Sequence, residues 1–424
     1  MLLTLLCLVF GEAGNFPVNR SELYKEGLDV LLKKWDAKRN IERDQVYKNL
    51  SLQRKEDLLS QIALTTFEQK NYFFKQKTVE ADIADFIRNL RDAHTEPKEL
   101  ELDSEAVLRS IEGQHGLLVE RAKGIYSFSH LTFQEYFAAR EIVANSAWEK
   151  LVEHITETRW RQVFLLTVGM MRKADDLMLL MKRKIDVLLA DDENMQQFLM
   201  WISQKSLSVE ISDKTAVARA FYFDLEYATT ATTLTTNQVV RNQVVVLTLI
   251  FNPNRDYTEI ARVFHLAFAL DNNRATTLDL ELDINLARTL MLATTYDFHD
   301  DVNYDVNYSL ACALKYTSET NLELQKLKEQ LPDQCGDKQT YKTWWKTHGK
   351  TWTQQLRSTI VKCRNIGHDW QFSNVQQQLL QQYYDANKLL VDCLNSDCYI
   401  SREVRQEIEE TLLLPMSEIE KRQK

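Results

Sequence analysis

Scarcity of glycine and proline is the feature that most restricts how this chain can fold. The 424 residues include only 10 glycines and 5 prolines, so few positions suit tight turns or breaks between elements. Residues that favour helices, such as Leu, Gln, Glu, Lys and Ala, recur throughout. We therefore predict a mainly α fold with short connections, and the length allows roughly two to four domains.

Charge and cysteine content narrow the class of protein. A formal net charge of −9 argues against a nucleic-acid surface spread over the whole chain, although it leaves room for a local basic patch. Six scattered cysteines in a long chain favour reduced thiols over a disulfide framework, so we expect a cytoplasmic protein. Cys393 and Cys398 have no second Cys/His pair nearby at metal-ligand spacing, and no metal site is expected.

The first ten residues, Met1–Phe10, are apolar. They are too short to span a membrane and no basic residue precedes them, as a signal peptide would require. We interpret them as a buried helix whose packing partner lies upstream of Met1, which is a first indication of a fragment. No membrane association is expected.

A single β signal interrupts the helical pattern. Helical runs are expected at Lys55–Lys70, at Thr78–Leu90 and in a short helix opened by Ser104, after a loop around His94–Pro97. Two short apolar runs follow, Leu117–Arg121 and Ile125–Phe128, joined by a turn in which Gly124 can adopt positive φ. Three helices followed by a hairpin predict a winged helix.

A winged helix often binds DNA, and the helix before the hairpin is the place to test this. The stretch Ser104–Gln114 carries Glu105 and Glu112 against a single Arg109. Phosphate contacts need clustered Lys and Arg side chains. The sequence therefore favours a winged helix that packs against protein, and no DNA partner is expected.

Beyond Asn145 the chain is expected to form consecutive helices nearly to its end. Units of roughly 35–45 residues indicate stacked helical pairs, although no residue signature repeats. The expected helical segments include Leu165–Met171, Leu177–Leu189, Met195–Ile202, Ala216–Tyr227 and Tyr257–Leu270, with a loop at Thr229–Thr236.

A final segment follows Leu331–Pro332. It contains Trp344, Trp345, Trp352 and Trp370, then a Gln-rich helix at Val375–Asn395 and an amphipathic helix at Ser401–Leu414 stopped by Pro415. The tryptophans are interpreted as the core of a small helical domain, with a ligand surface as the alternative.

Nucleotide hydrolysis needs a phosphate-binding loop of the form Gly-x-x-x-x-Gly-Lys-Ser/Thr. Gly349-Lys350-Thr351 matches its end, but Trp344 stands where the first Gly is required, and no strand precedes it. No apolar strand ends in paired carboxylates for Mg²⁺. Walker A and Walker B motifs are thus absent from the sequence, and no catalytic residue is expected. An enzyme using Cys and His is a further hypothesis, for which Cys363, between Lys362 and Arg364, is the one faint candidate.

One stretch carries a specific resemblance. Phe128–Ala139, with the sequence FSHLTFQEYFAA, resembles the end of the winged-helix domain in NACHT proteins of the STAND class of signalling ATPases. Leu2–Cys7 is similar to the first helix after the NACHT ATPase core. His368–Phe372, and Asp392–Cys398 with Ser401–Leu414, resemble the C-terminal helical domain of bacterial NACHT proteins.

The resemblance implies the C-terminal part of a bacterial, NLR-like NACHT protein without its NTPase core. It implies four domains: a post-ATPase helical domain (1–45), a winged helix with one β-hairpin (46–145), a repeat-like helical sensor array (146–331) and a C-terminal helical domain (332–424). We expect a regulatory and sensory role in prokaryotic antiviral or stress signalling, in which a protein ligand or effector is sensed. The alternative is a free-standing helical scaffold that binds protein partners without nucleotide.

His130 is the candidate site residue. Thr132 and Glu135 have the spacing of a capping box, and Phe133 and Phe137 are expected to pack on the hairpin. His130 precedes this helix N-terminus, where anions are favourably placed. The resemblance implies that His130 reaches the β-phosphate of ADP and stabilises a closed state, with ADP or ATP bound only when the upstream NACHT core is present. The alternative is a histidine hydrogen-bonded within the hairpin–helix junction.

Overall fold

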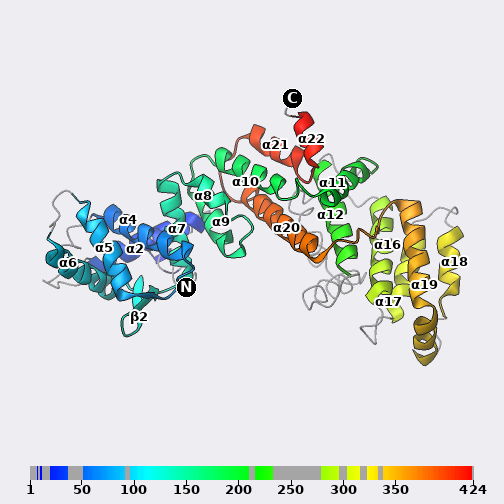
Figure 1. Ribbon diagram of the computed structural model, residues 1–424, viewed down its shortest axis with the longest axis horizontal. Coiled ribbons are helices and arrows are strands. Elements are labelled where there is room, and N and C mark those ends of the chain that lie inside the picture. The colour runs from blue at the N-terminus through cyan, green and yellow to red at the C-terminus, as the bar shows by residue number, and fades with distance from the viewer. Residues whose placement is uncertain are drawn as a thin grey trace. The chain divides into compact units, whose positions relative to one another are not determined.

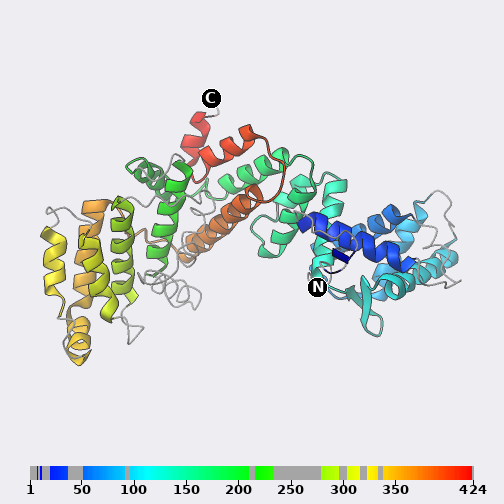
Figure 2. The ribbon, with the colours of Figure 1, turned by 180° about the vertical axis from the view of Figure 1, so that it is seen from behind.

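The computed structural model divides into two compact units (Figures 1 and 2). The first comprises Met1–Lys184 with Asp392–Ser401, and the second comprises Ile185–Val391 with Arg402–Lys424. The structure describes residues 7, 10–11, 20–36, 51–90, 96–209, 215–232, 278–295, 303–315, 322–332 and 338–422. Helices dominate the described residues of both units, which confirms the mainly α prediction.

A winged helix forms most of the first unit. Helix α4 packs along α7, and α5 packs on α6, around a core that includes the fully buried Leu58, Ile83 and Phe137. The elements are α2 (Arg20–Asp36), α4 (Leu52–Glu68), α5 (Gln76–Arg88), α6 (Pro97–Ser110) with one π turn (Ile111–His115), and α7 (Leu131–Ala144).

The sheet of this unit has three strands, not the two that the sequence indicates. β2 (Leu118–Ala122) and β3 (Ile125–Phe128) form the predicted hairpin, and Gly124 in its turn has φ 71°, as expected. β1 (Phe74–Lys75) pairs antiparallel with the other edge of β3. A two-residue strand is too short to produce a period-2 pattern, so only tertiary pairing reveals it.

The start of α6 differs from the prediction. The helix begins at Pro97, not at Ser104, so the prediction of its first residue was wrong. Proline suits the first helical position because its missing N–H has no intrahelical partner there. Ser104 lies inside the helix and does not cap its start, and its hydroxyl donates to the Glu101 carbonyl at 2.9 Å.

Helix α9 (Arg161–Met170) completes the cover of the winged helix. It packs on both α7 and α2, and the Ser21 hydroxyl donates to the Gly169 carbonyl at 2.9 Å. The preceding short elements are α8 (Trp148–Val152) and a 3₁₀ turn (Thr158–Trp160). The fully buried Trp160 meets Phe67 of α4 edge-on, with ring centroids 4.8 Å apart.

Helix α10 and the segment that follows α20 (Asn374–Leu394) meet within the first unit. Asp175 is the first residue of α10 (Asp175–Val187). Its carboxylate accepts hydrogen bonds from the Ser401 backbone N–H, at 2.9 Å, and from the Ser401 hydroxyl, at 2.7 Å. Cys398 donates its thiol to the Cys393 carbonyl, and Cys393 is fully buried. The two cysteines therefore stabilise a turn.

The second unit is an array of helices. Figures 1 and 2 show α16, α17, α18 and α19 side by side. The described elements are α11 (Glu193–Ser206), α12 (Thr215–Thr232), α16 (Leu278–Thr295), α17 (Asn303–Lys315), α18 (Leu322–Gln330), α19 (Lys338–Arg364), α20 (Asn374–Leu394), α21 (Arg402–Thr411) and α22 (Met416–Arg422). The helix expected at Tyr257–Leu270 lies outside the described residues. Thr229–Thr232 end α12 and do not form the loop predicted there.

Tryptophans fill the core of this unit. Trp345 and Trp352 of α19 are 5% and 2% exposed, and the Trp352 indole donates to the Leu327 carbonyl of α18 at 2.9 Å. Trp370 packs against Phe198 and Trp201 of α11. These contacts support the core interpretation for these three tryptophans. Of the helices that the structure describes, none has both the length and the apolar content required to cross a membrane.

Candidate functional site

His130 occupies the junction between the hairpin and α7. It is the N-cap residue of α7, in an extended conformation (φ −141°, ψ 142°), and its carbonyl accepts the N–H of Phe133 at 3.1 Å. The helix therefore begins at Leu131, two residues earlier in the chain than a capping box centred on Thr132 requires. That capping-box prediction was wrong, because the backbone already turns into the helix at His130.

The His130 side chain is exposed and makes no capping hydrogen bond. Its ring meets the Phe133 ring edge-on, with centroids 6.2 Å apart. Histidine is not among the residues that cap helices well. The imidazole is thus directed to solvent at a helix N-terminus, where backbone N–H groups attract anions.

Helix α7 is a firm base for this residue. Arg140 donates to Asp57 at 2.9 Å and to Ser60 at 3.1 Å on α4, and Gln134 donates to Thr66 at 2.9 Å. Phe128 of β3 contacts Phe137, with centroids 6.3 Å apart, as the sequence predicted. Because α7 is fixed by its contacts with α4 and with β3, the backbone of His130 is held in place without a capping bond from its own side chain.

Arg121 of β2 supports the same junction, and sequence reasoning missed it. Its guanidinium donates to the Ser129 carbonyl and to the Ser127 hydroxyl, both at 2.9 Å. These bonds hold the peptide directly before His130 and place a guanidinium at the junction. Only pairing across the hairpin brings Arg121 to Ser129, so spacing along the sequence does not reveal it.

The face of the winged helix that would read DNA is occupied by internal contacts. Arg109 pairs with Glu105 on α6. Glu112 accepts the backbone N–H of Glu120 at 3.0 Å and the Tyr126 hydroxyl at 3.2 Å. Burial and the Glu112 carboxylate raise the pKa of Tyr126 to about 12. This carboxylate-bearing surface is poorly suited to phosphate contacts.

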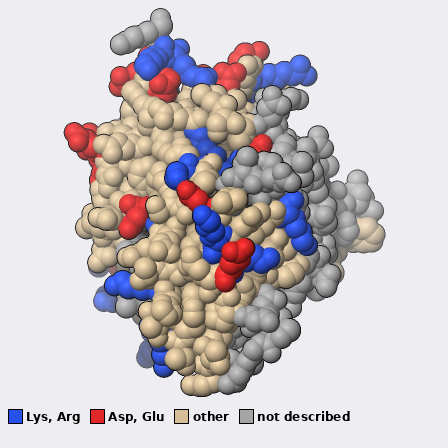
Figure 3. Space-filling model, turned by 90° about the vertical axis from the view of Figure 1, so that its right-hand side faces the viewer, with Lys and Arg blue, Asp and Glu red and all other residues tan. Residues whose placement is uncertain are grey.

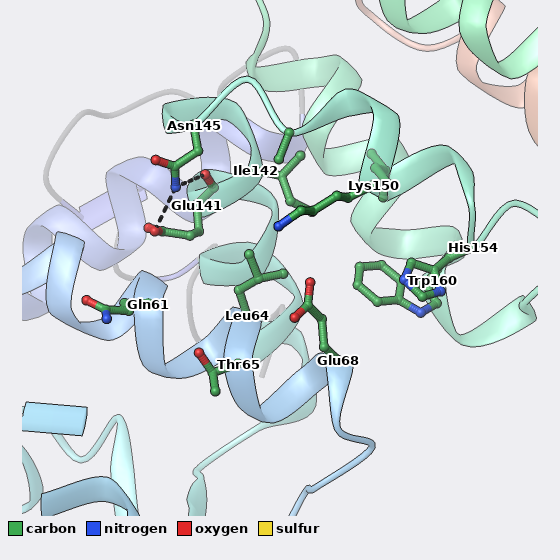
Figure 4. A pocket seen from close by; sticks show the side chains of 12 residues that line it. Gln61, Leu64, Thr65, Glu68, Glu141, Ile142, Asn145, Lys150, His154 and Trp160 are labelled. Atoms are coloured by element: carbon green, nitrogen blue, oxygen red, sulfur yellow. Dashed lines mark hydrogen bonds between the residues drawn. The ribbon is translucent and has the colours of Figure 1, made fainter. Parts of the chain in front are cut away.

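A small cavity of about 220 Å³ lies between α4, α7 and α8 (Figure 4). Glu68, Glu141, Lys150 and His154 are among the residues that line it. Burial raises the pKa of Glu141, whose carboxylate accepts the Asn145 amide at 2.8 Å. Pockets that hold drug-sized ligands usually measure ~300–1,000 Å³. The cavity is below that size, as expected for a gap left between packed helices.

The Gly349–Thr351 stretch lies inside the continuous helix α19. Backbone N–H groups in a helix interior are bonded within the helix and cannot surround a phosphate. The match of Gly349–Thr351 to a phosphate-binding loop is therefore accidental.

Cys363, the faint candidate nucleophile, is exposed near the end of α19. Of the flanking cations, Lys362 pairs with Glu323 at 2.8 Å and Arg364 pairs with Asp279 at 2.9 Å. Both charges are directed to carboxylates, so neither is arranged to stabilise a thiolate. Among the described residues, no cluster of three His, Cys, Asp or Glu side chains has the arrangement of a metal site.

Comparison with protein families identifies two segments. Residues 20–142 match a winged helix-turn-helix domain C-terminal to NACHT, and residues 320–415 match NACHT C-terminal helical domain 2. His130 lies inside the first match, and the His368–Phe372 segment lies inside the second. No curated protein and no solved structure matches the chain.

Proposed function

This chain is a NACHT-type protein that carries the winged helix and the second C-terminal helical domain of that family, and we propose that it is the regulatory and sensory part of a signalling ATPase. Full-length relatives of such domains include an upstream NACHT module. On this proposal ATP hydrolysis belongs to that module, and the domains described here control whether it is closed or open.

The observation that carries the proposal is the position of His130. An exposed imidazole at the N-terminus of a firmly held helix is suited to contact a phosphate that another module presents. We propose that His130 contacts the β-phosphate of ADP bound to the upstream module. A charge-assisted contact of this kind contributes ~1.5–3 kcal/mol, enough to shift a closed/open equilibrium about tenfold or more.

The helices after residue 145 supply the sensory half of the proposal. Helical arrays offer extended surfaces for protein partners. A partner that binds the open state more tightly than the closed state shifts the population toward the open state. The size of the shift is set by the difference between the two binding free energies. We propose that the partner is a protein in a prokaryotic antiviral or stress response, and that opening leads to assembly of an oligomer.

The test joins an upstream NACHT module to this chain and replaces His130 by Leu. We expect the H130L protein to retain less ADP after purification and to signal without its ligand. His348→Leu is the matched control, because His348 is also exposed but lies on α19 in the second unit. An H130L protein with unchanged ADP content and unchanged signalling would refute the role of His130.

Equilibrium dialysis of the chain as it stands with ADP tests whether the nucleotide site belongs to the upstream module. We expect no ADP binding that depends on His130, because most of the nucleotide site belongs to the upstream module. Tight binding of ADP that His130→Leu abolishes would place that site in this chain. A genomic reading frame upstream of Met1 that encodes Gly-x-x-x-x-Gly-Lys-Ser/Thr would support the regulatory role. Its absence from the gene would favour a free-standing helical scaffold.

A further inference from the structure

Helix α19 has an unusual charge composition. Its 27 residues contain seven Lys or Arg and no Asp or Glu. At its C-terminal end the charges are compensated, since Lys362 pairs with Glu323 and Arg364 pairs with Asp279 and Asp283. In the middle of the helix, Arg357 interacts electrostatically with Asp369 and Glu226, whereas Lys346 and Lys350 form no ion pair with a carboxylate that the structure describes.

These middle cations border a groove between α16 and α19. Its volume is about 450 Å³, within the range of ligand pockets. Lys346, Lys350 and Arg357 line it together with hydroxyl groups from Thr294 and Thr353. No carboxylate is among its lining residues, so every charged group in the groove is positive.

The cations are placed to act on one ligand. Lys346 and Lys350 are one helical turn apart, so their ammonium groups project from the same face. Both side chains are exposed, and neither forms an ion pair with a described carboxylate. Arg357 donates to the Gly367 carbonyl at 2.9 Å, which fixes the guanidinium and leaves further N–H donors for a ligand.

Trp345 gives the groove an apolar wall beside the cations. A Cβ at Gly349 would lie 2.8 Å from the indole, so glycine is what lets the ring lie against its own helix. Ala293 of α16 also lines the groove. A ligand with an uncharged portion next to its phosphates would find a surface for each part.

The surrounding surface indicates the size of the ligand. Figure 3 views the molecule from the side where α18 and α19 are labelled in Figure 1, and Lys and Arg are interspersed there with Asp and Glu. A long polyanion such as nucleic acid needs an extended positive track. A confined positive groove on a chain of net charge −9 is suited to a small anion.

We propose that the α16–α19 groove binds a small ligand that carries two or more linked phosphate groups, held by Lys346, Lys350 and Arg357. This site is separate from the contact proposed for His130, which lies in the first unit.

Isothermal titration of the full chain with inorganic pyrophosphate tests the proposal. Lys346→Gln with Lys350→Gln removes two exposed cations, and Lys326→Gln with Lys328→Gln on α18 is a control with the same change of charge at exposed positions. We expect the control to bind like wild type and the groove variant to bind at least about tenfold more weakly. The His130→Leu chain should bind pyrophosphate normally.

Three outcomes would overturn the proposal. One is that the wild-type chain binds no pyrophosphate at millimolar concentration. Another is equal binding by the groove variant and wild type, which would place the anion elsewhere. The third is that a single-stranded oligonucleotide binds at Lys346 and Lys350 more tightly than pyrophosphate, which would identify a nucleic-acid surface instead.

Discussion

The carboxylate of Glu226 on α12 accepts the backbone N–H of Gly367, which lies 141 positions away in the chain. Gly367 has φ 74°, and a Cβ there would lie 2.8 Å from the Leu290 side chain, so only glycine fits. The Trp370 indole donates to the same carboxylate at 3.4 Å. Glu226 therefore fixes the His368–Phe372 segment against the helical array of the second unit.

The first prediction concerns the pH dependence of this contact. Burial raises the pKa of Glu226 from its ordinary value of 4.5 to about 7, against the hydrogen bonds that favour the charged form. The folded state then binds the Glu226 proton more tightly than the unfolded state. The stability that this protonation contributes is therefore fully present below pH 4.5 and is lost as pH rises through about 7. The loss is on the order of 3 kcal/mol of unfolding free energy.

Glu226→Gln should remove most of this pH dependence while keeping an acceptor for Gly367. Urea unfolding of both proteins at pH 5 and pH 8, followed by tryptophan fluorescence, gives the comparison. If the two proteins lose the same stability between these pH values, Glu226 does not titrate as described.

The second prediction concerns Arg219, which is 3% exposed. It donates to the carbonyls of Glu409, Glu410 and Leu412 at 2.6–3.0 Å, at the end of α21 where such carbonyls lack helical partners. Burial lowers its pKa to about 10, so it stays charged at neutral pH. Arg219→Met should cost ~2–4 kcal/mol, because the carbonyls lose their donor.

Amide hydrogen exchange is the measurement for Arg219. Exchange over residues 402–422 should accelerate in Arg219→Met, because α21 loses its attachment to α12. Arg402→Met is the control, since Arg402 is exposed at the start of the same helix. Unchanged protection of α21 in the Arg219 variant would show that apolar packing alone holds the helix.

The third prediction concerns Asp175 and Ser401. Burial raises the pKa of Asp175, but the hydrogen bonds from Ser401 and the Lys173 ammonium outweigh it and lower the pKa below 3.8. Its stabilising contribution is present above the unfolded value and is lost as pH falls through the lowered value. Ser401→Ala should raise the pKa of Asp175 and cost ~1–2 kcal/mol at neutral pH.

Titration by carboxylate NMR gives the pKa of Asp175 directly. Ser358→Ala, at an exposed position in the middle of α19, should change neither the pKa nor the stability. A Ser401→Ala protein whose Asp175 still titrates as in wild type would contradict the assignment of these hydrogen bonds.

The fourth prediction uses the imperfect cap at His130. Asparagine there can accept an N–H from the first turn of α7, a bond that the histidine side chain does not make. His130→Asn should raise the unfolding free energy by ~0.5–1 kcal/mol in denaturant titrations followed by circular dichroism. A marked loss of stability would instead support the alternative in which His130 holds the hairpin–helix junction together.

The fifth prediction concerns Gly349 in α19. Alanine normally stabilises a helix interior by ~1 kcal/mol relative to glycine. Here the added Cβ would lie 2.8 Å from the Trp345 indole, so the ring must move and the variant should lose ~1–3 kcal/mol. Gly113→Ala, where no atom lies within 4 Å of the new Cβ, is the control and should be neutral or stabilising. Thermal unfolding with tryptophan fluorescence distinguishes the two.

Sequence reasoning predicted the parts of this protein that depend on local chemistry. The hairpin with its positive-φ Gly124, the burial of Phe137 and the helical character of the chain follow from turn residues and apolar spacing. β1 was missed because two residues carry no periodic signal. The start of α7 was misplaced because the Thr132-x-x-Glu135 pattern points to Thr132 as the N-cap, whereas the backbone enters the helix at His130.

The long-range polar contacts could not be predicted from the sequence. Arg219 reaches carbonyls about 190 positions away, and Glu226 reaches Gly367 across 141. Nothing in the residues around an arginine or a glutamate distinguishes a buried partner of this kind from a solvated charge. The groove beside Lys346 could not be predicted either, because residues of α16, far away in the sequence, form its other wall.

The packing of α9 has a practical consequence for anyone who wishes to study the winged helix alone. A chain cut after Asn145 would leave Phe67 without Trp160 and would remove the carbonyl that Ser21 uses. Such a piece would expose an aromatic surface and tend to aggregate. A soluble excised domain should extend from Arg20 through Met170, so that α9 continues to cover the apolar surface of the winged helix.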